Sequence, residues 1–268
     1  MLQKKHKALV LGGISEAKKL VAGLSAMNFD VVVSRATKVI QDELVFSNVK
    51  YRHGAIDKEG LLNLVQNEGF DLIIDCTHPY AANISENAYY VSNAAGIPLL
   101  VYNRPGIEAD IPGVIWADSH HHAAEFALDG RMVFLSAGSN NISIYTAKSD
   151  RIKSLIVRTL PGESFRQKLI NAGVQEENII QKRGPFSLQE NIDHFKSFKA
   201  EVLITKDSGE AGGVPAKLEA ASMLGMEVIV IKRPPRPAGE KFTSIDGLLR
   251  ALEALHPDMP GIKPLSNF

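Results

Sequence analysis

The sequence of 268 residues has one cysteine, no excess charge of either sign and no long apolar run. The single thiol, Cys76, excludes an intrachain disulfide framework and a multi-cysteine metal site. Thirty basic and thirty acidic side chains cancel, so no overall field favours nucleic acid or an anionic membrane. No apolar run approaches the roughly 18 residues of a membrane-spanning helix. These absences predict an ordinary globular protein of the cytoplasm that binds neither nucleic acid nor membranes.

The stretch from Ala8 to Lys18 has the pattern of a strand, a glycine turn and a helix. Gly12 and Gly13 let the backbone come close to a ligand, and the N–H groups at the helix start can bind a phosphate. The stretch lacks the full G-x-G-x-x-G spacing of dinucleotide-binding turns. A helix entered through two glycines and capped by Ser15 therefore stays open as an alternative.

Two further strand ends carry candidate ligand-binding residues. The β-branched run 30–34 predicts a buried strand, and Arg35, with Lys38 as second choice, follows it where a 2′-phosphate of NADP would lie. A solvated basic loop is the alternative. The strand predicted at 72–75 leads into Thr77 and His78, which offer a hydroxyl and a group that titrates near neutrality. A purely structural histidine is equally compatible with this pattern, and Cys76 is interpreted as a buried small side chain.

The chain contains an internal repeat. Gly54 to Asp71 and Gly184 to Glu201 are both 17 positions apart, and each stretch leads to an apolar strand, an Ala-rich helix and a final Arg-Pro. The repeat predicts an α/β protein of two Rossmann-like doubly wound domains, with mainly parallel sheets and a ligand cleft between them. The predicted divisions are residues 1–118 for a nucleotide-binding domain, 119–258 for a second domain that completes the substrate site, and 259–268 for a tail.

The second half has its own candidate loops, at 136–141, 182–186 and 206–213. The loop 206–213 combines a lysine, an aspartate, a serine and glycines at the head of a helix, a composition suited to phosphate or carboxylate. A flexible connector is the alternative. Arg233 and Arg236 on a proline-rich segment suit either carboxylate binding or surface exposure. The run His120 to His122 is interpreted as solvated, and no metal site is predicted because consecutive helical residues point in different directions.

Five segments together resemble the precorrin-6A reductases of cobalamin biosynthesis. They are LGGISEAKKLV at 11–21, DCTHPYAANIS at 75–85, KRGPFS at 182–187, TKDSGEAGGVPAKLEAA at 205–221 and KRPPRP at 232–237. The resemblance implies a two-domain reductase that transfers a hydride from NADPH to a ring double bond of precorrin-6A or cobalt-precorrin-6A, giving the 6B form. It also leaves room for contacts with other enzymes of that pathway. Ile14 departs from the family's commoner Gly-Gly-Thr opening.

Carried over by position, the resemblance assigns site residues. Those near the cofactor would be Gly12, Gly13, Ser15, Glu16, Ala17, Ser34, Arg35, Thr77 and His78. The proton that accompanies the hydride would come from solvent or from His78, Tyr80 or Asp207. The substrate's carboxylates would meet Lys206, Ser208, Gly209, Lys217, Arg183, Arg233 and Arg236. The long loop 209–213 more closely resembles the members that act on the cobalt-containing ring in the anaerobic route.

Other functions compete with this prediction. Another NAD(P)H-dependent reductase with a different acceptor shares every cofactor argument, and a non-enzymatic nucleotide-sensing module could use the same turn. A methyltransferase is disfavoured because S-adenosylmethionine has no phosphate for Arg35 to bind.

Overall fold

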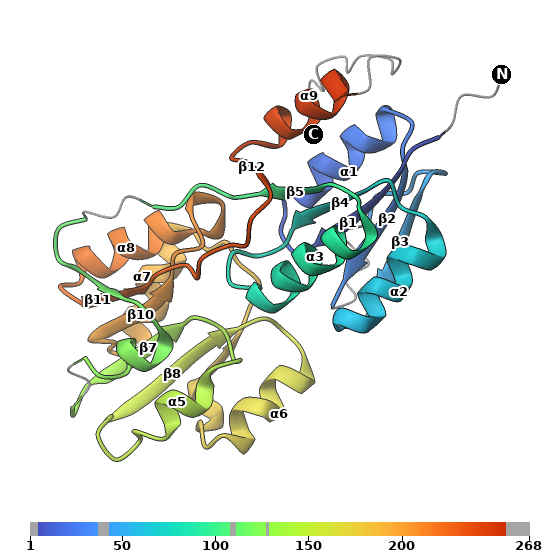
Figure 1. Cartoon of the computed structure of the whole chain (residues 1–268). Helices are drawn as coiled ribbons and strands as arrows, with labels where there is room; N and C mark the ends of the chain where they lie inside the picture. Colours follow the sequence, from blue (N-terminus) through green and yellow to red (C-terminus); the bar gives the residue numbers. More distant parts are fainter. Residues whose placement is uncertain (1–4, 37–42, 108–110, 127–128, 256–268) are drawn as a thin grey trace. The chain divides into compact units, whose positions relative to one another are not determined.

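The computed structural model of the chain describes residues 5–36, 43–107, 111–126 and 129–255 (Figure 1). In this described part, the strands form two six-stranded sheets whose pairings are all parallel. The chain divides into two compact units, which are described separately. Unit 1 holds the residues up to Arg104 and those from Pro234 onward, and unit 2 is Pro105–Arg233.

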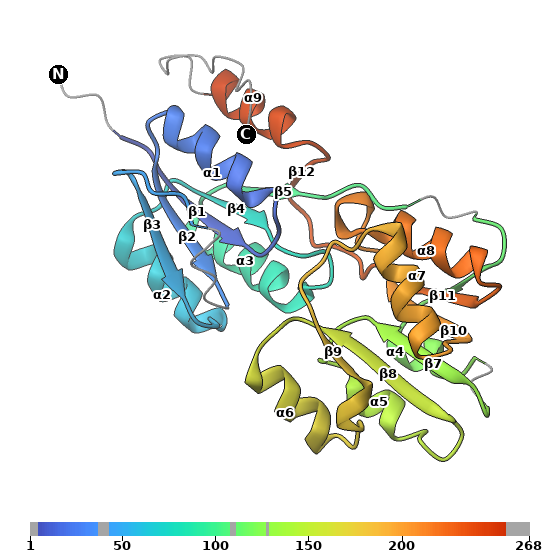
Figure 2. The same ribbon diagram turned by 180° about the vertical axis from the view of Figure 1, so that it is seen from behind.

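Unit 1 contains a sheet in the order β12-β5-β4-β1-β2-β3. Its elements are β1 (Lys7–Gly12), α1 (Ala17–Ala26), β2 (Asp30–Arg35), β3 (Val49–His53), α2 (Lys58–Glu68), β4 (Leu72–Cys76), α3 (Ala82–Ala95), β5 (Leu99–Tyr102), β12 (Glu240–Phe242) and α9 (Ile245–Leu255). The central strands are mostly apolar, with Lys7 in β1 and Asp75 in β4 as exceptions, because helices cover both faces, as in other parallel sheets. Helices α1 and α9 share one core with the sheet, and α2 and α3 share the other (Figures 1 and 2).

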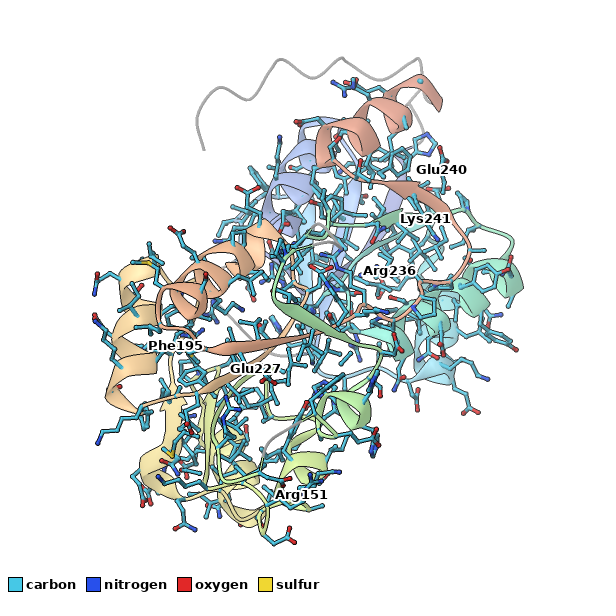
Figure 3. All side chains as sticks on the ribbon, turned by 90° about the vertical axis from the view of Figure 1, so that its left-hand side faces the viewer. Arg151, Phe195, Glu227, Arg236, Glu240 and Lys241 are labelled. Carbon is cyan, nitrogen blue, oxygen red and sulfur yellow. The ribbon has the colours of Figure 1, made fainter. Side chains whose placement is uncertain are left out.

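Unit 2 contains a sheet in the order β6-β11-β10-β7-β8-β9. Its elements are β6 (Val114–Ala117), α4 (His120–Ala123), β7 (Met132–Ser136), α5 (Ile142–Thr146), β8 (Ser154–Thr159), α6 (Glu163–Asn171), the 3₁₀ turn η2 (Glu176–Asn178), β9 (Ile179–Gln181), α7 (Leu188–Ser197), β10 (Val202–Lys206), the 3₁₀ turn η3 (Glu210–Gly212), α8 (Val214–Met223) and β11 (Glu227–Ile231). Helices α7 and α8 pack on one face, where Phe195, labelled in Figure 3, meets Phe134 edge to face at 4.9 Å between ring centroids.

If the edge strand beside β5 or β11 is counted as the sixth, both sheets have the order 3-2-1-4-5-6 of a doubly wound fold, although in unit 2 this edge strand, β6, comes first in the chain. The predicted fold class of two Rossmann-like domains with mainly parallel sheets is therefore confirmed. In such a sheet, ligands bind beyond the carboxyl ends of the strands, beside the point where the strand order reverses. That point lies between β1 and β4 in unit 1 and between β7 and β10 in unit 2.

The division between the units differs from the predicted boundary at residue 118. Strand β6 pairs with β11, so the chain enters unit 2 at Pro105. Strand β12 pairs with β5 and α9 packs against α1, so the chain returns to unit 1 at Pro234. Each sheet thus takes its sixth strand from beyond a linker, which a contiguous division could not anticipate. The predicted tail, 259–268, lies outside the described residues.

The predicted elements match the observed ones to within one or two residues. The strand predicted from the run 30–34 is β2, and the strand predicted at 72–75 is β4. No helix in the described ranges is both long enough and apolar enough to cross a membrane.

Candidate functional site

The glycine turn after β1 exposes backbone donors. Within the described part of the chain, the N–H groups of Gly13, Ile14 and Ser15 make no hydrogen bond. The next two amides are used by the helix itself, since Ala17 and Lys18 donate to the carbonyls of Ile14 and Ser15, both at 3.2 Å. Gly13 and Ser15 are exposed to solvent, whereas Ala17 is buried. The turn can therefore offer amides to an anion, while Ala17 serves the helix core.

Gly12 and Gly13 place this turn against two other candidate groups. A methyl group on Gly12 would lie 3.2 Å from Val33 Cγ1 and 3.5 Å from Arg35 Nε, and one on Gly13 would lie 3.5 Å from the backbone nitrogen of His78. The close approach follows from the parallel register, which pairs Gly12 with Cys76. The predicted phosphate turn, the cation after β2 and the loop after β4 therefore lie together.

The carboxyl end of β2 carries a basic cluster. The guanidinium of Arg35 lies over the ring of Tyr51, 5.2 Å from its centroid. Arg52 of β3, which the sequence reasoning did not select, donates from Nη1 to Ser34 Oγ at 3.3 Å and to the carbonyl of Gly54 at 2.8 Å. Ser34 and Arg52 face each other in the β2–β3 register. Lys38, the second choice for this role, lies outside the described residues.

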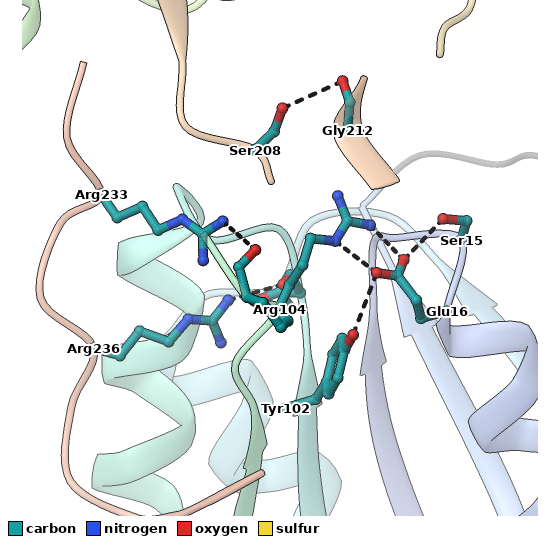
Figure 4. Close-up of polar contacts among 10 residues, drawn as sticks. Ser15, Glu16, Tyr102, Arg104, Ser208, Gly212, Arg233 and Arg236 are labelled. Atoms are coloured by element: carbon teal, nitrogen blue, oxygen red, sulfur yellow. Dashed lines mark hydrogen bonds and ion pairs between the residues drawn. The ribbon is translucent and has the colours of Figure 1, made fainter. Parts of the chain in front are cut away.

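Glu16 binds a protein cation in this structure (Figure 4). Its carboxylate accepts hydrogen bonds from both Nε (2.6 Å) and Nη2 of Arg104 and from Ser15 Oγ (2.8 Å). Burial favours a raised pKa for Glu16, but the bonds from Arg104 and Ser15 outweigh it and lower the pKa below its ordinary value. Burial and the charge of Glu16 raise the pKa of Tyr102 to about 12. Glu16 therefore anchors Arg104, the residue at which the chain leaves unit 1, to the glycine turn.

Asp75, within β4, organises the loop that follows it. The carboxylate is fully buried and accepts four hydrogen bonds. Two come from Thr77, from N–H at 3.0 Å and from Oγ1 at 2.6 Å, one from Ser85 Oγ at 2.6 Å and one from Arg236 Nη1 at 2.8 Å. Arg236 also donates from Nη2 to the carbonyl of Thr77 at 2.8 Å. The sequence reasoning missed Asp75, although a carboxylate in the apolar run LIIDC was a usable signal.

His78 and Tyr80 project from this ordered loop. The Nδ1 atom of His78 accepts from the N–H of Tyr80 at 3.3 Å, and the two rings lie 5.7 Å apart. A neutral imidazole that accepts at Nδ1 carries its hydrogen on Nε2, so His78 can donate a hydrogen bond there, whereas transfer of a proton requires the imidazolium form. Both residues are half-buried. Cys76 is fully buried, and its burial raises the pKa of the thiol, which agrees with its interpretation as an inert small side chain.

In unit 2, the loop after β10 is built around Asp207. Its Oδ1 atom accepts from the N–H groups of Gly209 and Ile107, both at 3.1 Å. Arg233 donates from Nε to the carbonyl of Asp207 at 2.8 Å and lies 2.9 Å from Oδ2. These contacts tie the Asp207 side chain to its own loop and to the segment that begins unit 2. Ser208 Oγ donates to the carbonyl of Gly212 at 3.4 Å (Figure 4).

A second loop packs on this one at Gly213. That residue has a φ of +69° and would place a methyl group 3.1 Å from Pro185 Cβ. A side chain here would therefore be strained both in its backbone conformation and in its contact. Arg183, predicted to bind substrate, is exposed on the 182–186 loop.

Unit 2 also contains two buried cations, Lys217 and Arg158. Lys217 of α8 donates to Thr205 Oγ1 at 3.2 Å, and burial followed by the charge of Arg158 lowers the pKa of Lys217 to about 7. Arg158 of β8 bonds Asn191 Oδ1 at 2.9 Å and lies 4.0 Å from the centroid of the Phe186 ring. Within the described residues, neither cation has a hydrogen bond or ion pair with a carboxylate. Lys217, a predicted substrate residue, thus lies near Arg158, which the sequence did not single out.

The histidine run is not uniformly solvated. His120 is half-buried and bonds Tyr145 through Nδ1 at 2.8 Å, which corrects the interpretation of this residue as solvated. Burial, and then the charge of Lys206, lowers the pKa of His120 to about 4. Burial also lowers the pKa of Lys206, at the end of β10. No group of three or more His, Cys, Asp or Glu side chains in the described ranges could hold a metal ion.

The comparisons with known proteins cover both units. The model of the family described as precorrin-6x reductase CbiJ/CobK matches residues 7–253, which include the glycine turn and the loops after β4 and β10. The chain belongs to the precorrin-6x reductase family. Membership confirms the resemblance predicted from the motifs, and with it the oxidoreductase class and the assignment to cobalamin biosynthesis.

Relatives of this reductase family resemble the chain along most of its length. The cobalt-precorrin-6A reductase of Methanothermobacter thermautotrophicus is 34% identical over 238 residues, covering 87% of this chain and 78% of the relative. The precorrin-6A reductase of Rhodococcus erythropolis is 33% identical over 248 residues, covering 91% and 96%. A solved structure of CobK precorrin-6A reductase has a TM-score of 0.79 at 27% identity, covering 94% of this chain and 97% of that one.

Proposed function

We propose that this chain is an NADPH-dependent reductase that reduces one ring double bond of precorrin-6A or cobalt-precorrin-6A to give the 6B form. The observation that carries the cofactor assignment is the position of Arg35 beside Gly12, at the carboxyl end of β2. In doubly wound folds this position meets the ribose of the nucleotide, where a guanidinium accommodates a 2′-phosphate. Membership in the reductase family supports the choice of reaction.

The residues present fit a dinucleotide. The pyrophosphate would meet the exposed amides of Gly13, Ile14 and Ser15, since none of them has another partner in the described part of the chain. Ser34 and Arg35 would hold the ribose phosphate, with Arg52 fixing the hydroxyl of Ser34. Glu16 would not contact a phosphate directly, because its carboxylate binds Arg104. Its place in the site is to hold the turn.

The chemistry divides between cofactor and protein. NADPH, when bound, supplies the hydride. The loop Thr77 to Tyr80 would orient the nicotinamide and exclude water from it. His78 is the proposed proton donor, acting from its imidazolium form, because it follows β4 where the loop approaches Gly13 of the glycine turn. Tyr80 is the second choice, and Asp207 is assigned instead to holding its loop.

The substrate's carboxylates require cations, and unit 2 provides them. Lys206 ends β10, Arg183 is exposed on the 182–186 loop, and Ser208 and Gly209 follow Asp207. Lys217 lies deeper and would contribute positive potential together with Arg158 rather than a direct contact. Relatives named for the cobalt-containing and for the metal-free substrate match at 34% and 33% identity, so the proposal keeps both rings.

A fluorescence titration of the purified protein with NADPH, NADH and S-adenosylmethionine tests the cofactor assignment. The proposal predicts saturable binding of NADPH with clear preference over NADH. Binding of NADPH without reduction of any tetrapyrrole would favour the nucleotide-sensing module. Binding of S-adenosylmethionine alone would overturn the reductase assignment.

A further inference from the structure

Arg236 was predicted from the sequence to bind substrate, but its side chain is only 7% exposed and is held by unit 1. Its two terminal nitrogens bind the carboxylate of Asp75 and the carbonyl of Thr77, both at 2.8 Å. Figure 3 labels Arg236, which lies on the segment between β11 and β12. Because only 7% of the side chain is exposed, little of its surface is accessible to a ligand carboxylate.

Thr77 is consequently tied at three points. Its N–H and its hydroxyl both donate to Asp75 Oδ1, and its carbonyl accepts from Arg236. Removing Arg236 would release the carbonyl, which belongs to the peptide bond that leads into His78. The orientation of His78 therefore depends on an arginine that is distant in the sequence, since Arg236 lies 159 positions after Thr77.

Unit 2 repeats the arrangement around Asp207. Each aspartate, Asp75 or Asp207, accepts the N–H of the residue two positions later, Thr77 or Gly209. Each aspartate also binds one arginine of the segment 233–236: Arg236 binds Asp75 in unit 1, and Arg233 binds Asp207 in unit 2. The Nη2 atom of Arg233 also donates to the carbonyl of Pro105 at 2.9 Å. The two arginines are separated only by Pro234 and Pro235.

We propose that Arg236 and Arg233 are positioning residues, which set the loops after β4 and β10 through Asp75 and Asp207, and that neither is a ligand of the substrate. The inference rests on the proposed function for the identity of what the two loops bind. Preorganisation of such loops by buried, bidentate guanidinium contacts removes an ordering cost at the moment of binding. It also explains why two arginines with ligand-like sequence context bind protein carboxylates.

Hydrogen exchange of the ligand-free protein tests the loop assignment without any cofactor. Arg236→Gln is expected to speed exchange in the peptide covering Thr77 to Tyr80 by about tenfold, because a charge-assisted contact that holds Thr77 is lost. The peptide covering Ser208 and Gly209 should be unchanged. Arg233→Gln is the matched control and should give the opposite pattern. Unchanged exchange at 77–80 in Arg236→Gln would overturn the proposal.

Kinetics then distinguish positioning from substrate binding. Arg236→Gln should lower kcat and weaken NADPH binding by about tenfold each, with KM for the corrin ring changed less than about twofold. Arg236→Lys, which keeps the charge but not both contacts, should recover part of the lost kcat and remains informative if Arg236→Gln unfolds. A raised KM for the ring with normal kcat and normal NADPH affinity would instead make Arg236 a substrate ligand.

The two proposals fail in different ways. If wild-type protein binds no NADPH, the proposed function is wrong, and the exchange experiment still decides whether Arg236 orders the loop. If wild-type protein is an active reductase and the exchange patterns of the two variants are identical, the positioning roles are wrong while the function stands.

Discussion

The two units share one strand order but treat their buried cations differently. In unit 1, Arg104 and Arg236 each bind a carboxylate, Glu16 and Asp75. In unit 2, Arg233 binds Asp207, but Lys217 and Arg158 are buried without a carboxylate partner in the described ranges. Buried charges are costly unless they are paired. The comparison indicates that Arg104 and Arg236 of unit 1 hold loops, whereas Lys217 and Arg158 of unit 2 provide positive potential suited to an anionic ligand.

The largest effect on stability is expected from breaking the Arg236–Asp75 ion pair in unit 1. Asp75→Asn would leave Arg236 buried without its counter-ion and should lower the free energy of unfolding by about 3–5 kcal/mol. Urea unfolding followed by circular dichroism measures the change. Ser85→Ala is the control, because it removes one neutral donor to the same carboxylate and should cost only about 1 kcal/mol. Equal losses in the two variants would show that the ion pair has no special weight.

Removing an unpaired cation in unit 2 should have the opposite sign. The pKa of Lys217 falls from 10.5 in the unfolded chain to about 7 in the native state, so the unfolded chain binds the proton more tightly. The penalty on wild-type stability is therefore absent above pH 10.5, grows as pH falls and is complete below about pH 7. Lys217→Met should raise the free energy of unfolding by up to about 4 kcal/mol at pH 6, and by little near pH 10.

Urea unfolding of wild type and Lys217→Met across that pH range measures this difference. The charge-free but polar variant Lys217→Gln separates loss of the charge from gain of apolar packing. A variant that is less stable than wild type at every pH would contradict an uncompensated buried lysine.

A substitution of Arg35 tests whether unit 1 binds the 2′-phosphate of the cofactor. Arg35→Ala should weaken NADPH binding by about 1–3 kcal/mol and leave NADH binding nearly unchanged, because only NADPH carries the 2′-phosphate. Fluorescence titration with both nucleotides measures the difference. Arg52→Ala serves as a comparison variant, because Arg52 hydrogen-bonds Ser34 whereas Arg35 lies beside Gly12. An equal loss for both nucleotides would show that Arg35 does not read the phosphate.

The smallest predicted effect concerns Lys206. Lys206→Ala should reduce turnover by about tenfold while NADPH affinity stays within about twofold of wild type, because Lys206 belongs to unit 2 and to the proposed substrate loops. Steady-state kinetics with saturating ring, combined with the NADPH titration, separates the two. Normal turnover would remove Lys206 from the substrate site.

The sequence predicted the parallel sheets because the repeat preserves apolar strands and glycine turns at equal spacing. It did not predict the exchange of sixth strands. The three residues of β12, Glu240–Phe242, carry no apolar pattern, and β6 lies in a stretch rich in proline and glycine, so neither had a signal that fixed its sheet. Pairing between distant segments is decided by tertiary contacts that local propensity does not encode.

The candidate site was predicted in position more successfully than in role. The residues at the strand ends were identified because parallel strands place their carboxyl ends at one edge of a sheet. In the structure Glu16, Asp207 and Arg236 bind protein groups, which the sequence did not indicate, because an arginine binds a protein carboxylate and a ligand carboxylate by the same chemistry. Only the folded structure distinguishes which carboxylate is within reach.

The most direct test of the proposed reductase is an anaerobic single-turnover reaction of the protein with NADPH and precorrin-6A, run with and without cobalt in the ring. Absorbance follows the oxidation of NADPH, and mass spectrometry follows the ring. The account predicts stoichiometric oxidation of NADPH and a product heavier by two hydrogen atoms for at least one of the two rings. Tight binding of NADPH with both rings recovered unchanged would contradict it.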